Sequence, residues 1–260
     1  MKNFTASVIA AAALVAAGSA SAALVTINAN DGLIDGAGTL TFSENLRNAL
    51  NVGSVTAEAF GDATSAITGA PGAYTNIAVS APVTSLVYDD TTNQVTKVFT
   101  SGGARQVAGN VAGVSGGGWV EVGNLEVDLV TNQIFGTIVG QSDAGASVDY
   151  YGKIFSIGAV TGDTTFKDGA ALTSLTTLAL DSVAFTQIST ALELEFLGNI
   201  SLQAASANFG DINSFICVPN LAGGGCSQPP VPSIPEPSTY VLMGLGLAGL
   251  VVARRRLAKA

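Results

Sequence analysis

Apolar and polar residues alternate in short runs through the middle of the chain. Residues 125–129 read Leu-Glu-Val-Asp-Leu and are followed, after a Thr-Asn-Gln turn sequence, by a second run at 134–139. An earlier stretch has the same plan, because residues 85–89 and 94–99 flank a Thr-Thr-Asn sequence. Alternation with a period of two is typical of half-buried strands, so both stretches are predicted to be β-hairpins.

Two segments depart from this alternation. Ser43 and Asp181 are favoured helix N-cap residues, and apolar residues recur three or four positions apart after each of them. The spaced residues are Leu46, Ala49 and Leu50 in the first segment, which Gly53 would close, and Phe185, Ile188, Ala191 and Leu192 in the second. We therefore expect residues 23–228 to form a mainly β domain, an antiparallel β-sandwich-like ectodomain with one or two short helices.

The N-terminus has the pattern of a secretory signal peptide. Lys2 supplies a positive charge, residues 8–17 are apolar, and Ala20-Ser21-Ala22 fits the small-x-small cleavage site. The apolar run is shorter than the ~20 residues that a membrane-spanning helix needs. We expect the secretion machinery to export the chain and signal peptidase to remove residues 1–22, which leaves Ala23 as the first residue.

The C-terminus combines a stiff spacer with a second apolar run. Residues 229–237 are rich in proline, which favours an extended chain. Residues 241–253 carry no charge and are followed by Arg254, Arg255 and Arg256. A helix of this length reaches only roughly 20 Å, against a hydrocarbon core of ~30 Å. By the positive-inside rule the arginines stay cytoplasmic, so residues 238–260 are expected to form a short transmembrane helix with a basic tail.

The order Pro235-Glu236-Pro237-Ser238, short apolar helix and arginine cluster resembles a PEP-CTERM sorting signal. The resemblance implies recognition by exosortase in a Gram-negative bacterium that makes exopolysaccharide and biofilm, with cleavage near Pro-Glu-Pro. The chain would be anchored in the inner membrane with its body in the periplasm until it is released to the cell surface or the extracellular space. The alternative is a permanent single-span anchor. Residues 244–249 also spell GxGxxG, but no strand or βαβ unit surrounds them, so a nucleotide site is disfavoured.

Composition narrows the chemistry that the body can perform. The 260 residues include no histidine, which excludes Ser-His-Asp catalysis, HExxH zinc sites and histidine-ligated haem. Only 11% of the residues are charged, and the net charge is -9. An acidic chain of this kind is a poor partner for nucleic acid.

The chain has two cysteines, Cys217 and Cys226. In an oxidising compartment we expect them to form a disulfide that staples the end of the domain before the proline spacer. The alternative is a nucleophilic or metal-binding thiol, although no histidine exists to activate one.

Pairs of carboxylates are the candidates for catalysis. Glu126 and Asp128 would share one face of a strand, and Glu193 and Glu195 would do the same if their segment is extended. Two carboxylates about 5–9.5 Å apart could serve a glycosidase. A solvated strand face explains the same alternation more simply, so no catalytic residue is assigned.

Two other features suggest ligands. Oxygen-rich stretches could bind Ca²⁺, but turn formation explains them without a metal and neither fits an EF-hand, so no cofactor and no metal site is assigned. These stretches comprise Asn28, Asn30, Asp31 and Asp35, and Asp89, Asp90 and Asn93. Trp119, Tyr150 and Tyr151 could form a sugar-stacking platform or fill the core.

Three functions remain. The first is a non-enzymatic exported surface or matrix protein with a structural or adhesive role in exopolysaccharide or biofilm. The second is a binding module for polysaccharide or another extracellular ligand, which exposed aromatic residues on one sheet face would favour. The third is a secreted carboxylate-based hydrolase, which requires two facing acids in a cleft.

Overall fold

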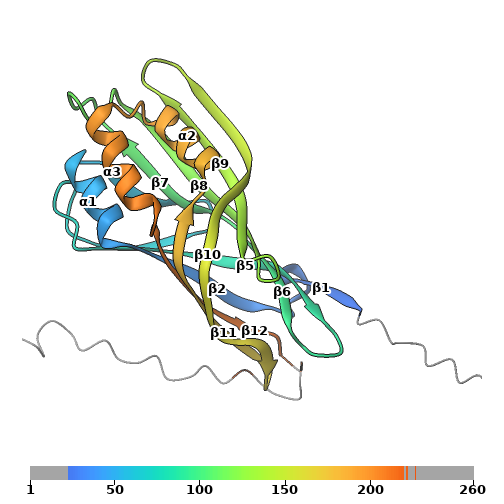
Figure 1. Ribbon diagram of the computed structural model, residues 1–260. Coiled ribbons are helices and arrows are strands. Elements are labelled where there is room, and N and C mark those ends of the chain that lie inside the picture. Colours follow the sequence, from blue (N-terminus) through green and yellow to red (C-terminus); the bar gives the residue numbers. More distant parts are fainter. Residues whose placement is uncertain (1–22, 220, 222–225, 227–260) are drawn as a thin grey trace, which may run out of the picture.

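The computed structural model describes residues 23–219, 221 and 226 (Figure 1). The predicted signal peptide, spacer, transmembrane helix and basic tail lie outside these residues. The described elements, in chain order, are β1 (Leu24–Asn28), a 3-10 turn (Ala29–Asp31), β2 (Asp35–Phe42), α1 (Glu44–Val52), β3 (Thr56–Phe60), β4 (Thr64–Thr68), β5 (Asn76–Asp89), β6 (Val95–Thr100), β7 (Gly103–Ala108), β8 (Gly118–Asp128), β9 (Gln133–Ser142), β10 (Ser147–Lys167), β11 (Ala170–Leu180), α2 (Ser182–Ala191), α3 (Phe196–Ser206) and β12 (Gly210–Cys217).

The antiparallel sheet closes into a barrel. Its order runs β5-β2-β12-β11-β10-β9-β8, and β6 completes the ring because it pairs with both β5 and β8. The mainly β, antiparallel character is confirmed, but the predicted sandwich is wrong in its topology. Two long strands cause the difference, because each pairs with two different strands along the same edge. Strand β5 pairs first with β2 and then with β1. Strand β8 pairs with β7 before its bulge and with β6 after it.

The three helices cover one end of the molecule (Figure 1). Helix α2 packs against β8, β9 and β10, and α1 packs against α3. The chain leaves the domain at the other end, because Cys217 pairs with Asp35 while Gly210 pairs with Phe42, next to α1. Leu24 pairs with Asp89 at the last residue of β5, which also lies at the end of the barrel opposite the helices. Both termini of the described domain therefore lie away from the helices.

Local sequence explains where the predicted elements begin and turn. The Ser43 hydroxyl accepts a hydrogen bond from the Leu46 N–H at 3.2 Å, and the Asp181 carboxylate accepts one from the Val183 N–H at 2.9 Å. Both predicted N-caps are therefore confirmed. Both predicted hairpins are also confirmed, and each turn places an asparagine, Asn93 or Asn132, in the left-handed conformation that this residue tolerates.

One hydrophobic cluster runs through the domain. Phe155, Ile154 and Leu178 are among its fully buried members. Among the described residues, an apolar cavity of about 60 Å³ lies inside the barrel, and another of about 50 Å³ lies beneath the helices. Within the described residues, none of the helices has both the length and the apolar character required to cross a bilayer.

Candidate functional site

A polar cluster lies on the outer face of the barrel and joins the paired strands β6 and β8 to a residue of β10 that reaches across β9. We define the Lys97 cluster as Lys97, Glu126, Asp128 and Tyr151. The Lys97 Nζ lies 2.6 Å from Glu126 Oε1 and 3.5 Å from Asp128 Oδ2, and the Tyr151 hydroxyl donates a hydrogen bond of 2.9 Å to Glu126 Oε2. Strand pairing builds the cluster, because Lys97 lies directly opposite Asp128 and Phe99 directly opposite Glu126.

The cluster favours the charged forms of its members. The hydrogen bond from Lys97 is the main cause that lowers the pKa of Glu126, and the same bond raises the pKa of Lys97. Burial opposes the ionisation of Asp128 and is its largest single influence, but hydrogen bonds from Thr131, together with the charge of Lys97, outweigh it and lower its pKa. The hydrogen bond to Glu126 raises the pKa of Tyr151. The two carboxylates are thus held ionised.

This electrostatic pattern differs from that of a glycosidase pair. Such enzymes need one carboxyl group whose raised pKa keeps it protonated as a general acid. Glu126 and Asp128 do share one strand face, as their spacing predicts, yet both pKa values are lowered. Asp128 has a further structural task, because its carboxylate accepts hydrogen bonds from the Val130 and Thr131 N–H groups at 3.0 and 2.8 Å.

The second predicted carboxylate pair does not form. Glu193 and Glu195 lie in the connection between α2 and α3, so their side chains do not alternate on a strand face. Glu193 has a positive φ of 47°, and Glu195 occupies the N-cap position of α3. The Glu195 carboxylate accepts a hydrogen bond of 2.6 Å from the Gly113 N–H, which ties the 109–117 loop to the helix.

Four aromatic residues lie at separate points along the outer face of the sheet. We define the outer aromatic face as Phe99, Trp119, Phe135 and Tyr151, which point outward from β6, β8, β9 and β10. Tyr151 is 61% exposed, whereas Trp119 is half-buried beneath the Arg105 guanidinium, 4.9 Å from the ring centroid. Arg105 also lies 3.5 Å from both Glu58 and Glu121. Tyr150, the neighbour of Tyr151, packs instead against the core.

The oxygen-rich stretches serve turns and strand ends. The Asp89 carboxylate accepts hydrogen bonds of 2.9 Å from the Thr91 and Thr92 N–H groups, and the bond from the Thr92 backbone lowers the Asp89 pKa. Asp90 Oδ1 accepts a bond from the Ala23 N–H at 3.2 Å. Across residues 23–219, 221 and 226, no group of three or more His, Cys, Asp or Glu side chains is placed to hold a metal ion.

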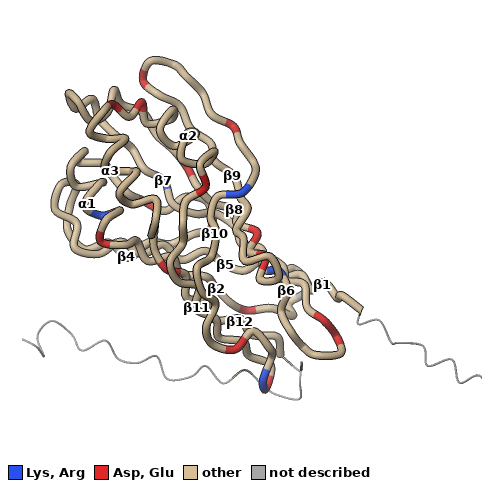
Figure 2. The backbone as a smooth tube through the Cα atoms, in the orientation of Figure 1, with Lys and Arg blue, Asp and Glu red and all other residues tan. Residues whose placement is uncertain are grey.

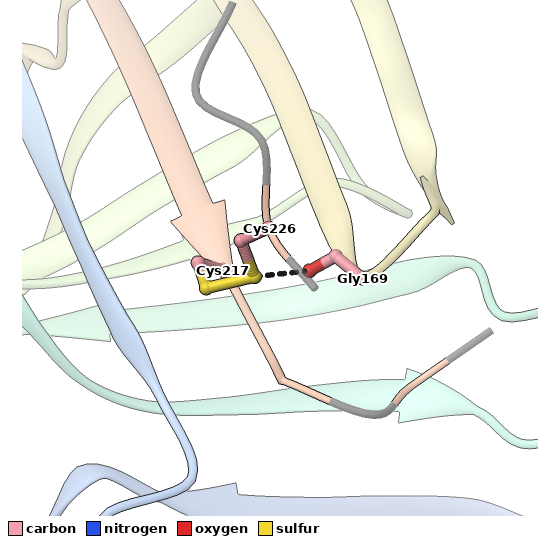
Figure 3. Close-up of a disulfide and its surroundings, with 3 residues drawn as sticks. All are labelled: Gly169, Cys217 and Cys226. Atoms are coloured by element: carbon pink, nitrogen blue, oxygen red, sulfur yellow. Dashed lines mark hydrogen bonds between the residues drawn. A yellow bond between two sulfur atoms is a disulfide. The ribbon is translucent and has the colours of Figure 1, made fainter. Parts of the chain in front are cut away.

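The two cysteines form the predicted disulfide (Figure 3). It joins Cys217, the last residue of β12, to Cys226, and this pairing excludes a free thiol at either position. Cys226 Sγ lies 3.3 Å from the Gly169 carbonyl oxygen at the β10–β11 turn, so the bridge fastens the chain to the barrel end. This approach is a contact and not a hydrogen bond, since a disulfide sulfur carries no proton to donate.

Comparisons with known proteins identify the sorting signal. Residues 233–256 match the family model of the PEP-CTERM protein-sorting motif, which supports an exosortase substrate and confirms the resemblance seen in the sequence. A search among curated proteins found no match. Two solved structures are similar in part: the C-terminal domain of HtaA from Corynebacterium glutamicum (10% identity, 71% of this chain and 98% of that chain, TM-score 0.45) and the heme-binding protein HtaB from the same organism (11% identity, 75% and 96%, TM-score 0.44). Both likenesses are too distant to transfer a function.

Proposed function

We propose that this chain, whose residues 233–256 carry the PEP-CTERM sorting motif, is a non-enzymatic protein that exosortase delivers to the cell surface or extracellular matrix. The motif is the observation that carries the proposal. Its position after a folded domain, together with the signal-peptide pattern at residues 1–22, fits a chain that is exported, held briefly in the inner membrane and then released.

The geometry of the domain suits this route. Cys217 lies at the end of the barrel away from the helices, so a tail anchored in the membrane would leave the helical end pointing outward (Figure 1). The Cys217–Cys226 disulfide closes the domain immediately before the spacer. A body that is already closed at its last strand would be unaffected when exosortase cuts near Pro235-Glu236-Pro237.

The proposed role of the body is structural or adhesive within anionic exopolysaccharide. Asp and Glu outnumber Lys and Arg by 19 to 10, and the acidic residues are spread over the strands and turns of the body (Figure 2). A body of this charge repels an anionic polymer unless divalent cations bridge the two. Retention in the matrix should therefore fall when EDTA is added.

A second candidate function, a polysaccharide-binding module, is favoured by the outer aromatic face. Exposed aromatic rings on one sheet face can stack on sugars, and Tyr151 presents its ring there with its hydroxyl held by Glu126. Affinity electrophoresis in gels that contain the matrix polysaccharide would test this role. Tyr151→Ala should lose retardation, while Leu172→Ala, which removes an exposed apolar side chain elsewhere on the barrel, should not.

Fractionation of cells tests the proposed sorting. Glu236→Ala should leave the chain in the membrane fraction, because the motif that exosortase recognises is broken. Glu44→Ala, a change at an exposed carboxylate in the body, should leave matrix delivery unchanged. Equal distribution of both variants between membrane and matrix would contradict exosortase sorting.

A further inference from the structure

The second cavity lies between the inner face of the sheet and all three helices. We call it the helix-covered cavity. Its volume is about 50 Å³. Leu46 and Leu50 from α1, Ile188 from α2 and Leu202 from α3 form its helical side, and Gln106 from β7 lies on the sheet side.

Gln106 is a polar residue without a partner in this apolar setting. It is only 7% exposed, and no hydrogen bond joins its side-chain amide to the part of the chain that the structure describes, yet the amide keeps some accessible surface, unlike Arg105 Nε and Asn208 Oδ1, which are fully enclosed and likewise make no hydrogen bond there. An amide that lines a cavity and has no partner in the protein can pair with a molecule bound there, because a hydrogen bond made in an apolar setting contributes free energy. Ser115, by contrast, is paired within the protein: its hydroxyl donates to the Leu192 carbonyl at 2.6 Å and accepts from the Gly117 N–H at 3.0 Å.

Strand geometry aims the Gln106 side chain into the cavity. Along β7 the buried positions alternate with half-buried ones, and Gln106 falls on the buried side while its neighbours Arg105 and Val107 face outward. Gln106 lies opposite Val120 of β8, which is fully buried, and opposite Ala57 of β3, which is also buried. The cavity is therefore the space in which the Gln106 amide could meet a hydrogen-bonding partner.

We propose that the helix-covered cavity binds a small, neutral, mainly aliphatic molecule whose hydroxyl or carbonyl group pairs with the Gln106 amide. Apolar walls with one placed polar group are typical of small-molecule sites. No charged side chain lines the cavity among the described residues, so a carboxylate or an amine would lose its hydration without compensation. This inference does not depend on the sorting route or on the matrix role.

The cavity volume limits the size of the ligand. A water molecule needs roughly 10–15 Å³ of cavity volume, so 50 Å³ corresponds to about three to five water-sized groups. A chain of four carbons with one oxygen matches that size. Water alone fits less well, since a buried water usually makes about three hydrogen bonds and Gln106 is the one lining residue with an unmet amide among those described.

NMR titration of the full chain with 1-butanol tests the proposal. The side-chain ¹⁵NH₂ signal of Gln106 should shift saturably, together with the backbone signals of Leu50 and Leu192. Gln106→Leu should weaken 1-butanol binding about fivefold, because one hydrogen bond is lost, while binding of xenon, which needs no polar group, should remain. Gln141→Leu, at an exposed position on the outer face, is the matched control and should bind like the parent chain.

A cavity-filling variant keeps the test decisive if Gln106→Leu fails to fold. Ala49→Leu adds three carbons to a lining position of α1 and leaves Gln106 in place, so it should abolish binding of both probes. The proposal is overturned if neither probe gives a saturable shift at Gln106, which would mean that water alone occupies the cavity. It is equally overturned if Gln106→Leu and Gln141→Leu weaken 1-butanol binding to the same extent.

Discussion

Replacing Lys97 with methionine tests the electrostatic account of the Lys97 cluster. The change keeps a long aliphatic side chain and removes the positive charge between Glu126 and Asp128. A hydrogen bond between charged groups contributes about 1.5–3 kcal/mol. Because the Lys97 side chain is 39% exposed, solvent screening reduces this value, and we expect a loss of about 1 kcal/mol in the free energy of unfolding near neutral pH.

The stability cost of Lys97→Met should be largest near neutral pH and should decrease as the pH falls. Folding lowers the pKa of Glu126 from its ordinary value of 4.5 and that of Asp128 from 3.8. Their contribution to stability is therefore complete above these ordinary values and is lost as the pH falls through the lowered values of the folded state. Below both, the carboxylates are neutral in both states. The difference between the parent chain and Lys97→Met should then nearly vanish.

Urea unfolding at about pH 7 and at the lowest pH at which the parent chain still unfolds cooperatively, about pH 2, followed by the fluorescence of Trp119, measures this difference. Lys167→Met is the matched control, because Lys167 makes an exposed i,i+4 pair with Asp163 and its loss should change stability by less than about 0.5 kcal/mol. The reasoning is refuted if Lys97→Met costs the same at both pH values. That result would assign the effect to packing of the lysine stem and not to its charge.

Three further changes test other parts of the fold by thermal or urea unfolding. Cys217→Ser should remove about 2.5 kcal/mol in the loop-entropy model for a separation of 9 residues, and reductant should have no added effect on this variant. Gly140→Ala should cost at least about 2 kcal/mol, since the new Cβ would lie 2.5 Å from the Trp119 carbonyl oxygen, whereas Gly109→Ala meets no atom within 4 Å and should be nearly neutral. Ser43→Ala should cost about 1 kcal/mol through loss of the α1 cap, and a neutral result would contradict the capping role.

Local patterns in the sequence were sufficient to predict individual elements. Alternation predicted the β5–β6 and β8–β9 hairpins, and the N-caps Ser43 and Asp181 predicted α1 and α2. Helix α3 was missed because Glu195 makes no side-chain cap to it and because its apolar residues Phe196 and Ile200 face solvent. An amphipathic pattern therefore could not be recognised.

Local patterns could not predict which strands pair with one another across the barrel. Closure of the barrel depends on β6 pairing with two strands at once, and alternation is the same in a sandwich and in a barrel. Spacing placed Glu126 and Asp128 on one face but could not reveal Lys97, which is brought opposite Asp128 only by pairing between β6 and β8. The lack of a partner for Gln106 likewise depends on which helices cover β7.

The central claim is that the chain is exported and then cut at its sorting motif. Mass spectrometry of the two termini, performed separately on membrane, matrix and supernatant fractions, tests it most directly. The account predicts a mature species that begins at Ala23 and ends near Pro235-Glu236-Pro237 in the matrix or supernatant. An intact Arg254-Arg255-Arg256 tail in every fraction would contradict it and would indicate a permanently anchored envelope protein.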